Sequence, residues 1–242
     1  MIRRNRALLW ERMAAWRRRA SVTGPPRMFS LNAFIKSFHA LALGVPSTLI
    51  VSLLGIAIGL LVGAMICAGA LSLSRTLRSA AAVWISFFRG VPLMVQLLLM
   101  FYLLPVTGIN VPPMVAAVLA VGLCSSAYVA EIWRGAINAL PRGQAEAAVA
   151  IGMLPHAIWT RIILPQAVRL SLPALVNELI LLVKASSLVS LVGIWEITRA
   201  SQAEAGASYR PLEAYVAAGC LYLVINLCLA TLGRYLERRA AA

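Results

Sequence analysis

Long apolar runs, separated by short basic or polar segments, dominate the chain. A helix needs about 20 mainly apolar residues to cross the hydrocarbon core of a bilayer. Five runs are long enough, at residues 46–71, 82–104, 112–133, 172–195 and 214–233. The pattern therefore predicts an all-α integral membrane protein with five transmembrane helices.

The composition points to the same class. Of 242 residues, 61% are hydrophobic and only 12% are charged, whereas a soluble domain is about half apolar and about a quarter charged. The net charge of +14 comes from arginines gathered at the ends of the runs and near the N-terminus, where they can face anionic lipid headgroups. No basic face carries interleaved aromatic residues, so the charge predicts contact with a lipid membrane and no nucleic acid.

The arginines also predict an orientation, because Lys and Arg favour cytoplasmic loops. Arginines follow the first run, surround the loop after the third and follow the fifth, whereas residues 105–111 contain neither Lys nor Arg. We therefore expect the first and third loops and the C-terminus in the cytoplasm, and the N-terminus outside. Residues 1–27 conflict with this orientation, because their eight arginines favour the cytoplasm.

The N-terminal segment has several interpretations. Leu9, Met13 and Trp16 have helical spacing, which suits an amphipathic helix in the membrane interface, but a disordered tail or an alternative start of translation fits as well. Residues 29–45 could form an interfacial or re-entrant element that lets the extension reach the cytoplasm. We divide the chain into a basic extension and pre-membrane segment at 1–43, a transmembrane domain at 44–236 and a cytoplasmic tail at 237–242.

Small residues in the first run predict close helix packing. Gly55, Gly59 and Gly63 recur every four residues, so on a helix they form one smooth face that another backbone can approach. We favour packing within the chain over a contact between subunits. The four cysteines lie inside apolar runs without a Cys-x-x-Cys pair, and the two histidines are far apart. We therefore expect small buried cysteines, no disulfide framework and no metal site.

The loop between the third and fourth runs reads EAAVAIGMLPHAIWTRIILP at residues 146–165. Glu146 would lie in the first turn of a helix, where the helix dipole favours a carboxylate. Ala147 and Ala148 are small enough for another surface to pack closely on them. Gly152 permits a sharp bend, and Pro155 suits the first turn of a second helix.

Apolar residues in this loop predict a contact surface. Trp159 would add an exposed aromatic side chain. If the bend is modest, one apolar stripe would form from residues with helical spacing, namely Ile151, Leu154, Ile158 and Ile162. Docking on a partner is the favoured interpretation, and a loop that lies on its own bilayer surface is the alternative.

Several collinear segments resemble one family. The spacing of Glu-Ala-Ala, Gly and Leu-Pro in residues 146–165 resembles the EAA loop of ATP-binding cassette (ABC) importer permeases. FRGVPLMVQ at residues 88–96, SAYVAEIWRG at 126–135, ILPQA at 163–167 and KASSL at 184–188 are similar to segments of the histidine/glutamine/arginine-type permeases for polar amino acids. The resemblance covers residues 44–236. Ala185-Ser186-Ser187 departs mildly from the family pattern, and the basic extension is not part of it.

This resemblance implies a type I ABC importer permease fold in a bacterial inner membrane. It implies partners as well: two ABC ATPase subunits, an identical or similar permease subunit, and an extracytoplasmic solute-binding protein that delivers a polar amino acid. It implies that a cytoplasmic loop couples the permease to the ATPases, through Glu146, Ala147, Ala148, Gly152, Trp159, Leu164 and Pro165. The alternatives are an importer permease for an oligopeptide, sulfonate or ion, an intramembrane enzyme, and a structural scaffold.

The chain itself carries no signature of catalysis. Its only lysines are Lys36 and Lys184, so it lacks the Gly-rich loop with Lys that cradles the phosphates of ATP. We expect no cofactor and no enzyme activity on this chain. ATP hydrolysis would belong to a separate subunit.

Charged residues inside membrane spans are functional candidates by default. Lys184 lies within the fourth run, with Asn177 seven residues earlier on the same helical face and Glu178 on a different face. We place Lys184, Asn177, Ser187, Arg89 and Glu131 in a candidate substrate path. Lys184 is a candidate for direct contact with the substrate. For Arg89 and Glu131 we favour gate or packing roles, because Glu131 can pair with Arg89 or locally with Arg134.

Overall fold

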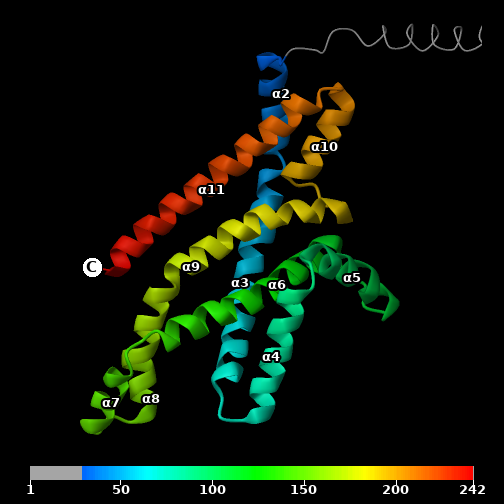
Figure 1. Ribbon diagram of the computed structural model, residues 1–242. Coiled ribbons are helices and arrows are strands. Elements are labelled where there is room, and N and C mark those ends of the chain that lie inside the picture. Colours follow the sequence, from blue (N-terminus) through cyan, green and yellow to red (C-terminus); the bar gives the residue numbers. More distant parts are fainter. Residues whose placement is uncertain (1–28, 242) are drawn as a thin grey trace, which may run out of the picture.

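The computed structural model describes residues 29–241, which form helices and turns without a β-strand (Figure 1). The amphipathic helix predicted around Leu9 lies outside these residues. Helix α2 (Leu31–Ala42) begins at Ser30, whose hydroxyl accepts a hydrogen bond from the Ala33 N–H at 3.4 Å. It leads through Leu43 and Gly44 directly into α3 (Val45–Leu71), which confirms the first predicted span.

The lengths of the helices agree with a multispanning protein. Four are long and apolar enough to cross a membrane: α3, α6 (Pro113–Asn138), the continuous helix of Pro155–Val192, and α11 (Pro211–Ala241). The pair α4 (Arg75–Gly90) and α5 (Leu93–Val106) forms a fifth if it counts as one span. α11 continues through the region that we assigned to a C-terminal tail.

The second predicted span, residues 82–104, is divided between two helices and is not one continuous helix. α4 and α5 meet at an angle of 103°, because Pro92 lacks an N–H group and disfavours helical geometry at the residue before it. Val91 accordingly has extended backbone angles. The Gln96 side chain stabilises the break, since its amide donates to the carbonyls of Phe88 at 3.0 Å and Val91 at 2.7 Å.

The predicted fourth span also has wrong boundaries. The helix begins before residue 172, with α8 (Pro155–Ile158), a π-helical turn at Trp159–Ile163 and α9 (Leu164–Ala185) in one continuous path. It then tightens into a 3₁₀ segment at Ser186–Val192 and stops at Gly193, whose φ is +82°. Trp195 therefore lies beyond the helix.

The core of the fold is the crossing of α3 and α6. A Cβ atom on Gly59 would lie 2.7 Å from the Ser125 Oγ, and one on Gly63 would lie 2.8 Å from a Val129 methyl group. Such distances leave no room for a side chain, so the predicted glycine face packs within the chain. α6 is the most buried of the four long helices, with α3, α4, α5 and α9 packed around it.

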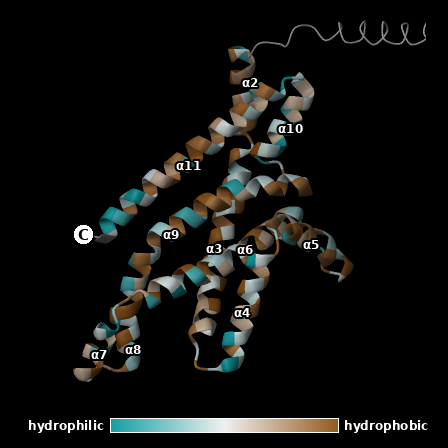
Figure 2. Cartoon of the chain, in the orientation of Figure 1, coloured by the Kyte–Doolittle hydropathy of each residue, from teal (hydrophilic) through white to brown (hydrophobic). Residues whose placement is uncertain are grey.

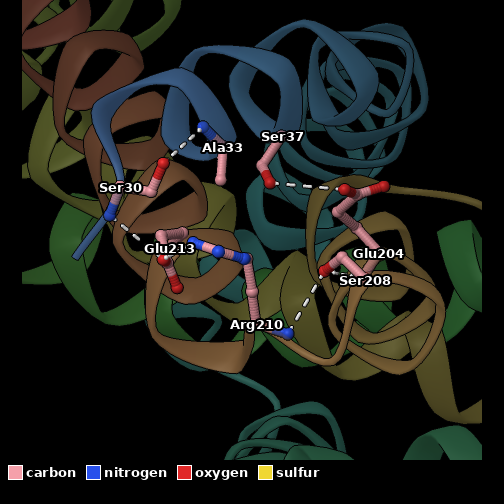
Figure 3. A network of polar contacts seen from close by, with 7 residues as sticks. All are labelled: Ser30, Ala33, Ser37, Glu204, Ser208, Arg210 and Glu213. Carbon is pink, nitrogen blue, oxygen red and sulfur yellow. Dashed lines mark hydrogen bonds and ion pairs between the residues drawn. The ribbon is translucent and has the colours of Figure 1, made fainter. Parts of the chain in front are cut away.

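A polar network joins α2, α11 and α10 (Ile197–Ser208) at one end of the molecule (Figure 3). The Ser30 N–H donates to Glu213 at 3.2 Å, Arg210 donates to Glu213 at 2.9 Å, and the Ser37 hydroxyl donates to Glu204 at 3.4 Å. These bonds satisfy the carboxylates of Glu204 and Glu213 beside the apolar cluster formed by α2, α10 and α11. They also hold α2 against α10 and α11.

Two loops lie at the opposite end of the molecule (Figure 1). They are the α3–α4 connection and the hairpin formed by α7 (Arg142–Ala150) and α8. The N-terminal end of α4 and the C-terminal end of α11 are hydrophilic, whereas the middle of α11 is hydrophobic (Figure 2). The loops that the arginine distribution assigns to one side of the membrane therefore share one end of the fold.

Candidate functional site

The α7–α8 hairpin, residues 142–163, turns at Gly152, whose φ is +77°. Only glycine adopts this left-handed region without a steric cost. Two backbone bonds close the end of α7, from the Gly152 N–H to the Val149 carbonyl at 2.9 Å and from the Met153 N–H to the Ala148 carbonyl at 3.0 Å. Pro155 then opens α8, as the spacing predicts.

The interior and exterior of this hairpin differ sharply. Ala148 and Ile158 are buried, whereas Glu146 and Ala147 are exposed. Ile151 is 79% exposed and Leu154 is 73% exposed. The four apolar residues therefore do not form one stripe, because the sharp turn at Gly152 separates an exposed tip of Ile151 and Leu154 from the buried Ile158. Val149, 65% exposed, extends the tip, although it was not among the residues singled out within the motif.

The base of the hairpin is tied to the span that follows it. The Gln166 side chain donates to the Gln144 side chain at 2.6 Å and to the Ile162 carbonyl at 2.8 Å. Trp159 is 40% exposed and lines a cavity of about 150 Å³ between α6, α7 and the π-helical turn. Leu164 and Pro165 are exposed at the start of α9. The hairpin is therefore joined to α9 by side-chain hydrogen bonds as well as by the continuous helix.

Three of the candidate path residues lie on α9 and the 3₁₀ segment that continues it. Lys184 and Asn177 are exposed, and the Ser187 hydroxyl donates to the Lys184 carbonyl at 2.8 Å. Within residues 29–241, no carboxylate lies within 4.0 Å of the Lys184 ammonium group. A cation at the centre of a membrane-spanning helix costs about 2.5–3.5 kcal/mol when it faces lipid. This face of α9 is therefore suited to water or protein rather than to hydrocarbon.

The other two path residues lie in an ion-pair cluster. Arg134 donates to both Glu131 carboxylate oxygens, at 2.8 and 2.7 Å, and Arg89 lies 3.8 Å from the same carboxylate. The Arg89 guanidinium also stacks over the Tyr128 ring, 5.5 Å from its centroid. Both predicted pairings of Glu131 are thus confirmed. The cluster links the C-terminal end of α4 to α6.

Glu178 faces away from Lys184. It is buried against α6, where the Ser125 hydroxyl donates to its carboxylate at 3.0 Å. An intramembrane enzyme would need an acid and a base on facing surfaces, and this arrangement does not favour that alternative. Sequence reasoning placed Glu178 on another face but did not find Ser125, because their pairing across two helices leaves no local signal.

A second buried carboxylate, that of Glu196, joins the start of α10 to α11. Glu196 caps α10 by accepting the N–H groups of Thr198 at 2.8 Å and Arg199 at 2.7 Å, and it accepts the Tyr222 hydroxyl at 2.8 Å. Burial raises the pKa of the Glu196 carboxyl, although these hydrogen bonds act in the opposite direction. Sequence reasoning missed this residue, whose signal was its position just before a new helix.

The four cysteines are free, as expected, but only Cys67 and Cys124 are buried. Cys220 is partly exposed and Cys228 is exposed on α11, so the expectation of four buried cysteines is wrong for these two. No group of three metal-ligating side chains is present in the part of the chain that the structure describes.

Membrane-length helices with an extended hairpin between two of them are the architecture of a multispanning membrane protein. Residues 55–242 match the binding-protein-dependent transport system inner membrane component family. The chain belongs to this family, and its predicted all-α permease fold is confirmed.

Relatives and solved structures agree. The chain is 38% identical to the arginine transport system permease protein ArtQ of Bacillus subtilis (strain 168), over 81% of this chain and 90% of ArtQ. It is 35% identical to the glutamine transport system permease protein GlnP of Escherichia coli (strain K12), over 87% of this chain and 97% of GlnP. An amino acid ABC transporter crystallised with histidines matches with a TM-score of 0.82 and 36% identity, over 88% of this chain and 99% of that one.

Proposed function

We propose that this chain is the membrane-spanning subunit of an ABC importer that carries a polar amino acid across a bacterial inner membrane. Two ABC ATPase subunits supply the energy, and an extracytoplasmic binding protein delivers the solute. A second permease chain, identical or similar, completes the path. Family membership supports the scheme, and relatives named for arginine and glutamine transport support an amino acid as the solute.

The observation that carries this proposal is the exposed apolar tip of the α7–α8 hairpin. Ile151 and Leu154 project at the end of the molecule where the arginine-bearing loops gather. Fully burying such a side chain contributes about 1.5–3 kcal/mol, which favours a partner with an apolar groove. We assign this partner as the ATPase. The coupling residues are those expected from the sequence: Glu146, Ala147, Ala148, Gly152, Trp159, Leu164 and Pro165.

The path is proposed to run along the exposed face of α9. Asn177, Lys184 and Ser187 line it, and the solute carboxylate interacts with Lys184. Arg89 and Glu131 act at its edge, where their ion pair holds α4 and α6 together. ATP-driven closure of the ATPases moves the hairpins, and the tie between Gln144 and Gln166 passes that movement to α9.

The test is reconstitution with a candidate ABC ATPase subunit. Leu154→Ser removes an apolar group from the hairpin tip, and Leu73→Ser does the same in the α3–α4 connection, where Leu73 is 97% exposed. We expect Leu154→Ser to weaken binding of the ATPase about tenfold or more, as the loss of one buried leucine predicts. Leu73→Ser should bind as wild type does. Equal binding by both variants would remove the hairpin tip from the interface.

A further inference from the structure

A cavity of about 300 Å³ opens between the ends of α3, α4 and α6. Ala70 and Arg78 in its lining flank the α3–α4 connection, which lies at the same end of the fold as the α7–α8 hairpin (Figure 1). Its lining includes Ala70, Arg78, Ala82, Ser86, Glu131 and Arg134. The proposed transport mechanism does not use Arg78, Ala82 or Ser86.

Positive charge exceeds negative charge around this cavity. The Arg134 Nε and Nη2 atoms hold Glu131, and Arg89 approaches the same carboxylate at 3.8 Å. The Arg78 Nη1 donates to the carbonyls of Ser72 at 2.9 Å and Leu73 at 3.0 Å, which fixes its guanidinium at the mouth of the cavity. A guanidinium has five N–H donors, so Arg78 and Arg134 both keep donors for an anion.

One face of α4 is polar and borders the cavity, whereas the neighbouring face is apolar. This contrast indicates an anion that carries an apolar group. Arg78, Ala82 and Ser86 follow helical spacing along the cavity side. The neighbouring face presents exposed apolar side chains, with Leu77 at 53%, Val83 at 70% and Phe87 at 48% exposure. Arg78 is three residues into α4, about 5 Å from its start, which is headgroup depth for a helix that enters the membrane there. The charged cavity thus lies next to an exposed apolar face of α4 that can hold an acyl chain.

We propose that this cavity binds the phosphate headgroup of an anionic phospholipid in the cytoplasmic leaflet. Arg78 and Arg134 donate charge-assisted hydrogen bonds to the phosphate oxygens, and an acyl chain lies along the apolar face of α4. Basic pockets between membrane helices on the cytoplasmic side suit this role. A free phosphate ion offers the same acceptor oxygens as the headgroup, but the exposed apolar face of α4 favours the lipid.

The experiment measures lipid retention on the purified permease complex after transfer to detergent containing phosphatidylglycerol and phosphatidylcholine. Native mass spectrometry counts the bound lipids. Arg78→Gln removes the charge, and Ala82→Leu fills the cavity without changing charge. Arg75→Gln and Ala203→Leu are matched controls, because Arg75 and Ala203 do not line the cavity. We expect retention of phosphatidylglycerol to fall about tenfold in Arg78→Gln and in Ala82→Leu. It should stay at the wild-type level in the two controls.

Three results would overturn the proposal: equal retention in all variants, equal retention of the two lipids, or displacement of the lipid by millimolar inorganic phosphate. Displacement by the transported amino acid would likewise refute it and assign the cavity to the solute. Size-exclusion profiles confirm that each variant is folded. The retention measurements and the phosphate competition do not depend on which solute the permease carries, so the site and the proposed function can fail separately.

Discussion

The turn at Gly152 provides a quantitative test of the hairpin. Its φ of +77° belongs to the left-handed region, and a Cβ atom there would meet nothing within 4 Å. A side chain at this position is therefore opposed by the backbone conformation and not by a clash. That conformation costs an L-residue about 1–2 kcal/mol, equivalent to a 5–30-fold smaller population of the native turn.

The assay is ATP hydrolysis and solute uptake by the reconstituted complex, measured for three variants. Gly152→Val pays the full cost and should lose most coupled activity. Gly152→Asn should retain more activity, because Asn visits the left-handed region more readily than other side chains. Gly143→Ala is the matched control, since Gly143 is helical and has open space around it. The expected order of activity is wild type and Gly143→Ala, then Gly152→Asn, then Gly152→Val.

Two outcomes would refute this reasoning. Full coupling in Gly152→Val would mean that the native turn is not needed for transmission. Equal losses in Gly152→Asn and Gly152→Val would show that bulk against the partner, rather than backbone strain, sets the effect.

Two further predictions concern the spans. Gly63→Ala should destabilise the subunit by about 1–3 kcal/mol, because the new methyl group would meet the Ser126 carbonyl oxygen at 2.9 Å. Thermal unfolding followed by tryptophan fluorescence should show a melting temperature of the Gly63→Ala subunit lowered by about 2–4 °C per kcal/mol. Gly219→Ala, in open space, should not lower the melting temperature. Lys184→Ala should reduce uptake while assembly with the ATPase stays intact, and unchanged uptake would exclude Lys184 from the path.

Local sequence chemistry was sufficient for much of this protein. The length of the apolar runs predicted the membrane class, since backbone groups in lipid must bond within a helix. Gly152 marked the turn because glycine permits a left-handed backbone conformation. Pro155 marked the start of α8 because proline restricts its own backbone to a helix-compatible φ. The i, i+3 pairing of Glu131 with Arg134 followed from helical spacing alone, and the distance of 2.7 Å agrees with it.

Tertiary structure decided what depends on partners distant in the chain. The apolar run at residues 82–104 predicted one span, whereas the structure bends it by 103° at Pro92, where Gln96 bonds the carbonyls of Phe88 and Val91. The separation of Ile151 from Ile158 depended on the hairpin closing on itself. The burial of Glu178 required α6 to bring Ser125 to it. Helical periodicity states which residues share a face, whereas only the packing of one helix on another determines what that face contacts.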